Sequence, residues 1–170
     1  MKALILSTLL AISLSVSADS EDTYSKYTLY LIRHAEKELD GSRDPVLTEV
    51  GKNRAEQLAK WFQSKGLEDI WSSDYHRTRD TVKPLLAKTG RKLMIYDPGD
   101  QTVLVKQLKD RQQTALIVGH SNTIPELARL LCKCTIADME DTEHNRLIVI
   151  SIIDDAVMAR TMKQNHLFHP

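Results

Sequence analysis

Short apolar segments alternate with longer amphipathic segments along this chain, and this alternation constrains the fold more than any other feature. The apolar segments are predicted strands at residues 27–33, 68–72, 92–96, 114–118, 147–153 and 157–162. Helical spacing of apolar residues predicts helices at 48–65, 75–89, 102–109 and 124–131. Strands that alternate with helices predict one layered α/β domain with a largely parallel sheet. The last two strands, separated by Asp154-Asp155, predict an antiparallel hairpin at a sheet edge.

The first 18 residues have the three parts of a secretory signal. Lys2 gives a positive start, Ala3 to Val16 is largely apolar, and Val16-Ser17-Ala18 offers small residues for cleavage. The apolar stretch is shorter than the roughly 20 residues of a membrane span, and an uncleaved anchor is the alternative. We therefore expect a signal peptide at 1–18, one domain at 19–170, and a periplasmic or secreted protein without a stable membrane anchor.

The charge balance argues against a nucleic-acid partner. The chain has 23 basic and 23 acidic residues, so its formal net charge is zero. A nucleic-acid binder would usually show a basic excess. Hydrophobic residues make up 42% and charged residues 27%, which is ordinary for a globular protein.

The only two cysteines, Cys132 and Cys134, stand two positions apart. This spacing makes an unstrained bridge between them difficult. Two cysteines do not supply the ligands of a zinc site. We expect free or loosely coupled thiols near a helix end, without a catalytic role.

Two of the predicted strands end in a histidine. His34 follows Arg33, and His120 follows Val118-Gly119. The carboxyl ends of parallel strands share one edge of the sheet, where ligands bind in open α/β folds. Neighbouring strands lie about 4.8 Å apart, so the two imidazoles can face one pocket. A third strand leads to Arg77, which can reach the same edge.

Histidine and arginine together suit metal-independent phosphoryl transfer. Arginine presents a fork of donors that matches phosphate oxygens. A neutral imidazole is a competent nucleophile, and nearby arginines keep it neutral. The same arginines stabilise the charge on the phosphoryl oxygens during transfer. This chemistry needs no cofactor.

Four segments resemble motifs of the histidine phosphatase superfamily, in its phosphoglycerate-mutase-like branch. They are Arg33-His34-Ala35-Glu36, Leu47 to Ala55, Ser72 to Thr81, and Val118 to Asn122. The resemblance implies a three-layer α/β/α sandwich with a mostly parallel sheet. It also implies roles: His34 is the nucleophile that becomes phosphohistidine, and His120 is the second pocket histidine. Arg33 and Arg77 match the phosphate-binding arginines.

The chain departs from the family pattern in ways that leave the general acid open. Ala35 replaces the signature glycine, and Ser121 stands where the acid-phosphatase branch has an aspartate. Asp100 and Glu36 are the candidate acids, together with Asp97. Their alternatives are turn formation for the two aspartates and an ion pair for Glu36.

The remaining candidates fall outside the motifs. We expect surface or tail positions for Arg79, His76, His144, His166 and His169.

The resemblance implies an exported phosphoric monoester hydrolase that acts through a phosphohistidine. Its substrate would be a phosphorylated small molecule, an envelope sugar or a phosphoprotein. Alternatives are a phosphohistidine phosphatase, a phosphoglycerate-type mutase, and a non-catalytic phosphate-binding module.

Overall fold

The computed structural model of the chain describes residues 25–167. The predicted signal peptide at 1–18 and His169 lie outside the described residues, as does the side chain of His166. Within residues 25–167, no helix combines the length and apolar character that a membrane crossing requires.

The observed elements follow the predicted order. The strands are β1 (Lys26–Arg33), β2 (Asp69–Ser73), β3 (Leu93–Tyr96), β4 (Ala115–Gly119), β5 (Arg146–Ile153) and β6 (Ala156–Lys163). The helices are α1 (Glu49–Phe62), α2 (His76–Thr89), α3 (Gln101–Arg111), α4 (Thr123–Cys132) and a final 3₁₀ turn, η1 (Gln164–Leu167).

The strands form one six-stranded sheet in the order β3-β2-β4-β1-β5-β6. β3, β2, β4 and β1 are parallel, β5 is antiparallel to β1, and β6 is antiparallel to β5. The predicted edge hairpin is therefore confirmed. β1 and β4 are neighbours in register, with Arg33 opposite Gly119, so the residues that follow them emerge side by side.

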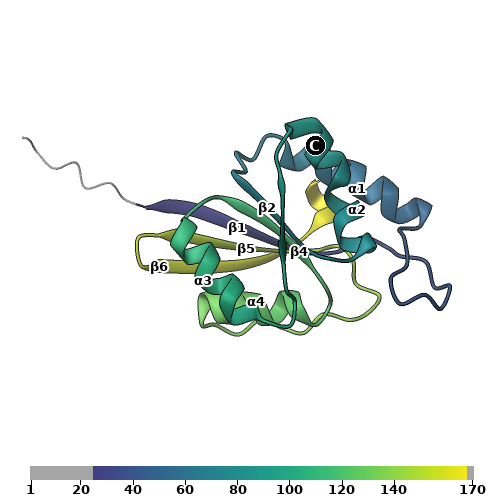
Figure 1. Cartoon of the computed structure of the whole chain (residues 1–170). Helices are drawn as coiled ribbons and strands as arrows, with labels where there is room; N and C mark the ends of the chain where they lie inside the picture. The colour runs from purple at the N-terminus through teal and green to yellow at the C-terminus, as the bar shows by residue number, and fades with distance from the viewer. Residues whose placement is uncertain (1–24, 168–170) are drawn as a thin grey trace, which may run out of the picture.

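Helices cover both faces of the sheet, which gives the expected three layers (Figure 1). Alternate side chains of β1 enter different cores. Leu29 and Leu31 pack in the core under α3 and α4, whereas Ile32 packs in the core under α1 and α2. All three are fully buried, and each such side chain contributes about 1.5–3 kcal/mol of transfer free energy.

Local signals set most helix boundaries. The Thr48 hydroxyl, at the position where the first helix is predicted to begin, caps α1 by accepting a hydrogen bond from the Gly51 N–H at 3.0 Å. The helix ends at Phe62, three residues before its predicted end at residue 65, and Gly66 follows with a φ of 63°. Pro84 lies inside α2 without ending that helix.

The segment 133–145 returns from the end of α4 to the edge that carries the histidines. Ile136 and Met139 are buried along its path, in the core under α3 and α4. Because β5 is antiparallel to β1, its start lies beside the end of β1, with Ile32 opposite Leu147. The last residues of the segment therefore lie next to His34.

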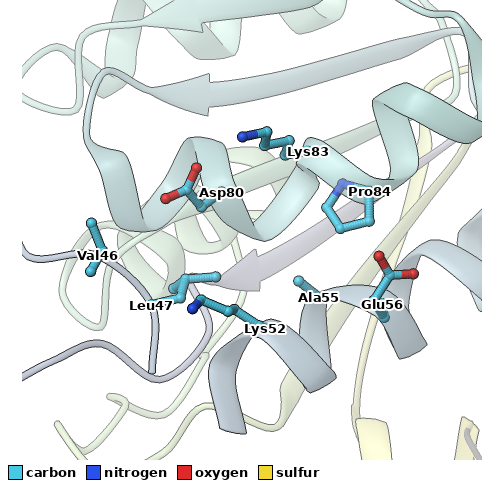
Figure 2. Close-up of a pocket in the computed structure, with 8 residues that line it drawn as sticks. All are labelled: Val46, Leu47, Lys52, Ala55, Glu56, Asp80, Lys83 and Pro84. Carbon is cyan, nitrogen blue, oxygen red and sulfur yellow. The ribbon is translucent and has the colours of Figure 1, made fainter. Parts of the chain in front are cut away.

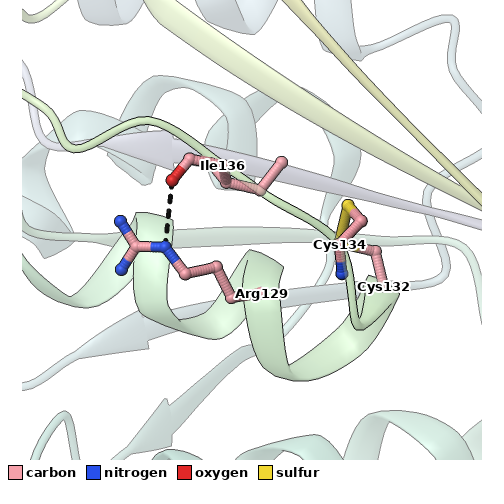
Figure 3. The surroundings of a disulfide bond; sticks show 4 residues. All are labelled: Arg129, Cys132, Cys134 and Ile136. Carbon is pink, nitrogen blue, oxygen red and sulfur yellow. Dashed lines mark hydrogen bonds between the residues drawn. A yellow bond between two sulfur atoms is a disulfide. The ribbon is translucent and has the colours of Figure 1, made fainter.

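Cys132 and Cys134 form a disulfide at the end of α4, so the prediction of free thiols is wrong (Figure 3). Lys133 between them adopts a left-handed conformation with a φ of 52°, and its N–H donates to the Arg129 carbonyl. This turn brings the two Cα atoms to 5.1 Å, within the usual range for a bridge. The Arg129 Nε then holds the chain beyond the bridge by donating to the Ile136 carbonyl at 2.9 Å.

Candidate active site

His34 lies buried at the end of β1 in one defined tautomer. Its backbone N–H donates to the Gly119 carbonyl at 2.9 Å, which ties it to β4. Its ring Nδ1 lies 2.7 Å from the Ala35 carbonyl oxygen, so Nδ1 is the protonated donor and Nε2 carries the lone pair. Burial, and next the charge of Arg33, lower the pKa of His34 to about 3, although the Ala35 hydrogen bond opposes this. His34 is therefore a neutral imidazole with a free nucleophilic nitrogen.

His120 faces His34, with 5.6 Å between the ring centroids. Its Nε2 lies 2.9 Å from the Ser73 hydroxyl at the end of β2. The Ser73 hydroxyl also lies 3.1 Å from the Thr78 hydroxyl, so Ser73 links His120 to the first turn of α2. Burial, followed by the charges of the two candidate arginines, lowers the pKa of His120 to about 4. The ends of β1, β2 and β4 thus meet at one site, as predicted.

Arg33 is buried beside His34 and binds the segment that precedes β5. Its Nη1 donates to the Glu140 carbonyl at 3.0 Å and to the Glu143 carbonyl at 3.3 Å. Its Nη2 lies 3.9 Å from an Asp141 oxygen. Burial lowers the pKa of Arg33, which nonetheless stays cationic.

Arg77 reaches the site from the first turn of α2. Its guanidinium lies over the Tyr75 ring at 4.2 Å, and that ring lies 5.1 Å from the ring of His120. Its Nη1 lies 3.3 Å from an Asp44 oxygen that also accepts the His76 backbone N–H at 2.9 Å. The loop that carries Asp44 therefore presents a carboxylate to this arginine.

Each of the two arginines has one buried nitrogen donor without an acceptor within residues 25–167. Among the residues the structure describes, the Nε atoms of Arg33 and Arg77 are buried and donate no hydrogen bond. A buried donor without an acceptor costs about 1–3 kcal/mol. Phosphoryl oxygens would supply the acceptors, and charge-assisted hydrogen bonds of this kind are strong.

His144, predicted to be a surface residue, is a third histidine of the site, so that prediction is wrong. Its Nδ1 donates to the His34 carbonyl at 3.0 Å, and the two rings lie 5.5 Å apart. Burial lowers its pKa. A histidine two residues before an antiparallel neighbour of β1 would have signalled this position, but only if the place of β5 in the sheet were known.

Two of the three candidate acids, Glu36 and Asp100, have other partners. Arg54 donates to both oxygens of Glu36, at 2.6 and 2.9 Å, which is the ion pair considered as the alternative. Burial acts to raise the pKa of Glu36, but the hydrogen bonds and charge of Arg54 outweigh it and the pKa is lowered. Asp100 is exposed and caps α3 by accepting the Val103 N–H at 3.1 Å.

Asp97, the third candidate acid, accepts the Gly99 N–H at 2.8 Å and forms a turn, which is the alternative considered for it. Arg79 and His76 lie at the surface, as expected. Arg79 pairs with Asp74 at 2.6 Å, and the His76 side chain is 56% exposed.

A cavity of about 460 Å³ lies apart from these residues, between α1 and α2 (Figure 2). It is lined by Val46, Leu47, Lys52, Ala55, Glu56, Asp80, Lys83 and Pro84. None of the predicted site residues lines it. Within residues 25–167, no three histidine, cysteine or carboxylate side chains are grouped so as to hold a metal ion.

Sequence comparison relates the chain to a family of known chemistry. The family model of the histidine phosphatase superfamily (branch 1) matches residues 29–99. The probable phosphoglycerate mutase GpmB of Proteus mirabilis is 33% identical over 94 residues, which cover 52% of this chain and 43% of the relative. The GpmB protein of Yersinia pestis (strain Pestoides F) is 34% identical over 76 residues, covering 41% of this chain and 35% of the relative. The chain thus spans less than half the length of these curated relatives.

Solved structures share the fold. The protein histidine phosphatase SixA, solved with tungstate, superposes with a TM-score of 0.68 at 16% identity, covering 82% of this chain and 99% of that chain. A mycobacterial glucosyl-3-phosphoglycerate phosphatase superposes with a TM-score of 0.63 at 17% identity, with the same coverage. Residues 29–99 thus match the histidine phosphatase superfamily (branch 1), and the chain as described shares the phosphoglycerate-mutase-like fold of the solved structures.

Proposed function

We propose that the chain is an exported, metal-independent phosphatase that hydrolyses a phosphomonoester through a phosphohistidine at His34. One observation carries the proposal. The neutral His34 presents a free Nε2 beside two arginines whose buried Nε donors lack acceptors. A dianionic phosphoryl group would satisfy both donors while its phosphorus faces the nucleophile.

In this reaction the His34 Nε2 attacks phosphorus and the ester oxygen leaves. Arg33, Arg77 and His120 hold the phosphoryl oxygens and stabilise the transferring group. Water then cleaves the phosphorus–nitrogen bond and releases inorganic phosphate. Export rests on the signal-like residues 1–18 alone. The substrate would be a phosphorylated small molecule, an envelope sugar or a phosphoprotein.

The test is trapping of ³²P on the mature chain, residues 19–170. The labelled protein is denatured under alkaline conditions, because acid hydrolyses phosphohistidine. Wild type should form a labelled enzyme and release phosphate from p-nitrophenyl phosphate. His34→Asn should do neither, while it still folds. Retained turnover in His34→Asn would overturn the mechanism. Binding of phosphate without any labelling would instead favour a non-catalytic phosphate-binding module.

A second candidate is a phosphatase of phosphohistidine in proteins. The superposition covers 99% of the SixA chain, which is named a protein histidine phosphatase, and this likeness supports the candidate. Release of phosphate from a histidine-phosphorylated protein, faster than from phosphomonoesters, would favour it. Transfer of the label to another hydroxyl of the substrate rather than to water would favour a mutase.

A further inference from the structure

A turn from Glu140 to Glu143 is fastened against the site. The Glu143 N–H donates to the Glu140 carbonyl at 2.9 Å, which closes the turn. Arg33 donates to both of these carbonyls from a single nitrogen. His144, the next residue, donates to the His34 carbonyl at 3.0 Å. Asp141 lies inside this turn, so its position is fixed by the residues at the end of β1.

The Asp141 carboxylate joins the ends of the two strands that carry the histidines. Its Oδ1 accepts a hydrogen bond from the Ser121 hydroxyl at 2.8 Å and lies 3.9 Å from Arg33 Nη2. Ser121 directly follows His120, and Arg33 directly precedes His34. The side chain is 92% exposed, so substrate and water can reach it.

The hydrogen-bond partner distinguishes Asp141 from the other carboxylates near the site. Glu36, Asp44 and Asp100 each accept from an arginine or a backbone N–H, groups that can only donate. Protonation of those carboxylates would weaken the contacts that hold them. The Ser121 hydroxyl can donate or accept, so Asp141 keeps its partner in either protonation state.

We propose that Asp141 is the proton donor and acceptor of the phosphatase reaction, an inference that rests on the proposed function. In the first step, the His34 Nε2–phosphorus bond forms, the ester bond breaks, and the leaving oxygen takes the Asp141 proton. In the second step, the carboxylate takes a proton from water, and the water oxygen attacks phosphorus. The phosphorus–nitrogen bond then breaks, which regenerates neutral His34 and protonated Asp141.

Leaving-group dependence tests this role. Asp141→Asn keeps an oxygen that accepts from Ser121 but cannot donate a carboxyl proton. Glu140→Gln is the matched control, since it removes the same charge from the same turn and leaves the Glu140 carbonyl in place. Phosphorylation of His34 is measured in single turnovers with p-nitrophenyl phosphate and with phenyl phosphate, whose less acidic phenol needs a proton to leave.

Asp141→Asn should slow phosphorylation of His34 by phenyl phosphate about 100-fold, the usual scale of general acid catalysis. The same variant should slow phosphorylation by p-nitrophenyl phosphate far less. Glu140→Gln should be phosphorylated at the wild-type rate by both esters. Equal slowing on the two esters would assign Asp141 a structural role and overturn the proposal, as would no slowing at all. If wild type itself forms no phosphohistidine, the proposed function fails instead, so the two failures are distinguishable.

Discussion

The ring Nδ1 of His144 lies 3.0 Å from the carbonyl oxygen of His34, so the backbone of one histidine is held by the side chain of another. These residues are 110 positions apart in the chain. The contact fixes the backbone of the proposed nucleophile from the side of β5, while the Gly119 carbonyl fixes it from the side of β4. His144 is thus a positioning residue.

Replacement of His144 with Phe should reduce kcat more than it changes KM. The variant keeps a ring but loses a hydrogen bond worth about 1 kcal/mol, which corresponds to roughly a fivefold fall in rate. His144→Asn, which retains a side-chain N–H, should recover part of the rate. The exposed His76→Gln serves as the control and should match wild type. An unchanged kcat in His144→Phe would show that the contact does not position His34.

Asp44→Asn should strengthen binding of phosphate and of phosphate esters. The Asp44 carboxylate lies 3.3 Å from Arg77 Nη1 and competes with a phosphoryl group for that cation. A partly exposed ion pair is worth about 0.2–1 kcal/mol, so the inhibition constant of inorganic phosphate should fall about twofold to fivefold. Asp40→Asn removes the same charge from the same loop and should leave the constant unchanged. Weaker phosphate binding in Asp44→Asn would mean that the carboxylate instead orients Arg77 for its ligand.

Stability should fall on acidification because His34 is buried in its neutral form. Its pKa is about 3 in the folded chain and about 6.5 when unfolded, so the unfolded state binds more protons between these values. The contribution is fully present above about pH 6.5 and is lost as the pH falls, by up to about 1.4 kcal/mol per unit. The free energy of unfolding measured in urea should therefore decline less between pH 6.5 and pH 5 for His34→Gln than for wild type. The exposed His76→Gln should keep the wild-type decline, and identical slopes for all three proteins would contradict the assignment.

Much of this fold was predictable because its signals are local. The Thr48 cap, the alternating apolar segments and the histidines at strand ends each depend on residues close in sequence. His34 and His120 could be brought together in advance because parallel strands end at one edge of a sheet.

The missed residues depend on pairings that are distant in sequence. His144 and Asp141 reach the site only because β5 pairs with β1 in the antiparallel direction, which returns segment 133–145 to the carboxyl edge. No local pattern encodes that strand order. The Cys132–Cys134 bridge depends on the left-handed backbone of Lys133, a conformation that a lysine rarely adopts.

The disulfide should contribute little to stability and nothing to the site. It closes a loop of three residues, for which loop-closure entropy predicts about 1.6 kcal/mol. The Arg129 side chain holds the Ile136 carbonyl independently of the bridge, so the course of the segment toward Asp141 should persist. Replacement of both cysteines with serine should thus lower the free energy of unfolding in urea by at most about 2 kcal/mol and leave kcat unchanged. A large loss of kcat would mean that the bridge positions the turn from Glu140 to Glu143.

Gly51→Ala should damage both stability and activity because of a close backbone approach. A Cβ at position 51 would lie 2.1 Å from the Glu36 carbonyl oxygen, and that oxygen also accepts the Thr48 N–H that starts α1. Either α1 or the segment after His34 must move, at a cost of about 1–3 kcal/mol. Gly66→Ala is the control. It carries a left-handed φ of 63° but meets nothing within 4 Å, so it should lower the thermal midpoint while kcat stays at the wild-type value. If Gly51→Ala also kept wild-type kcat, α1 alone would have moved, and the approach to Glu36 would be irrelevant to the position of His34.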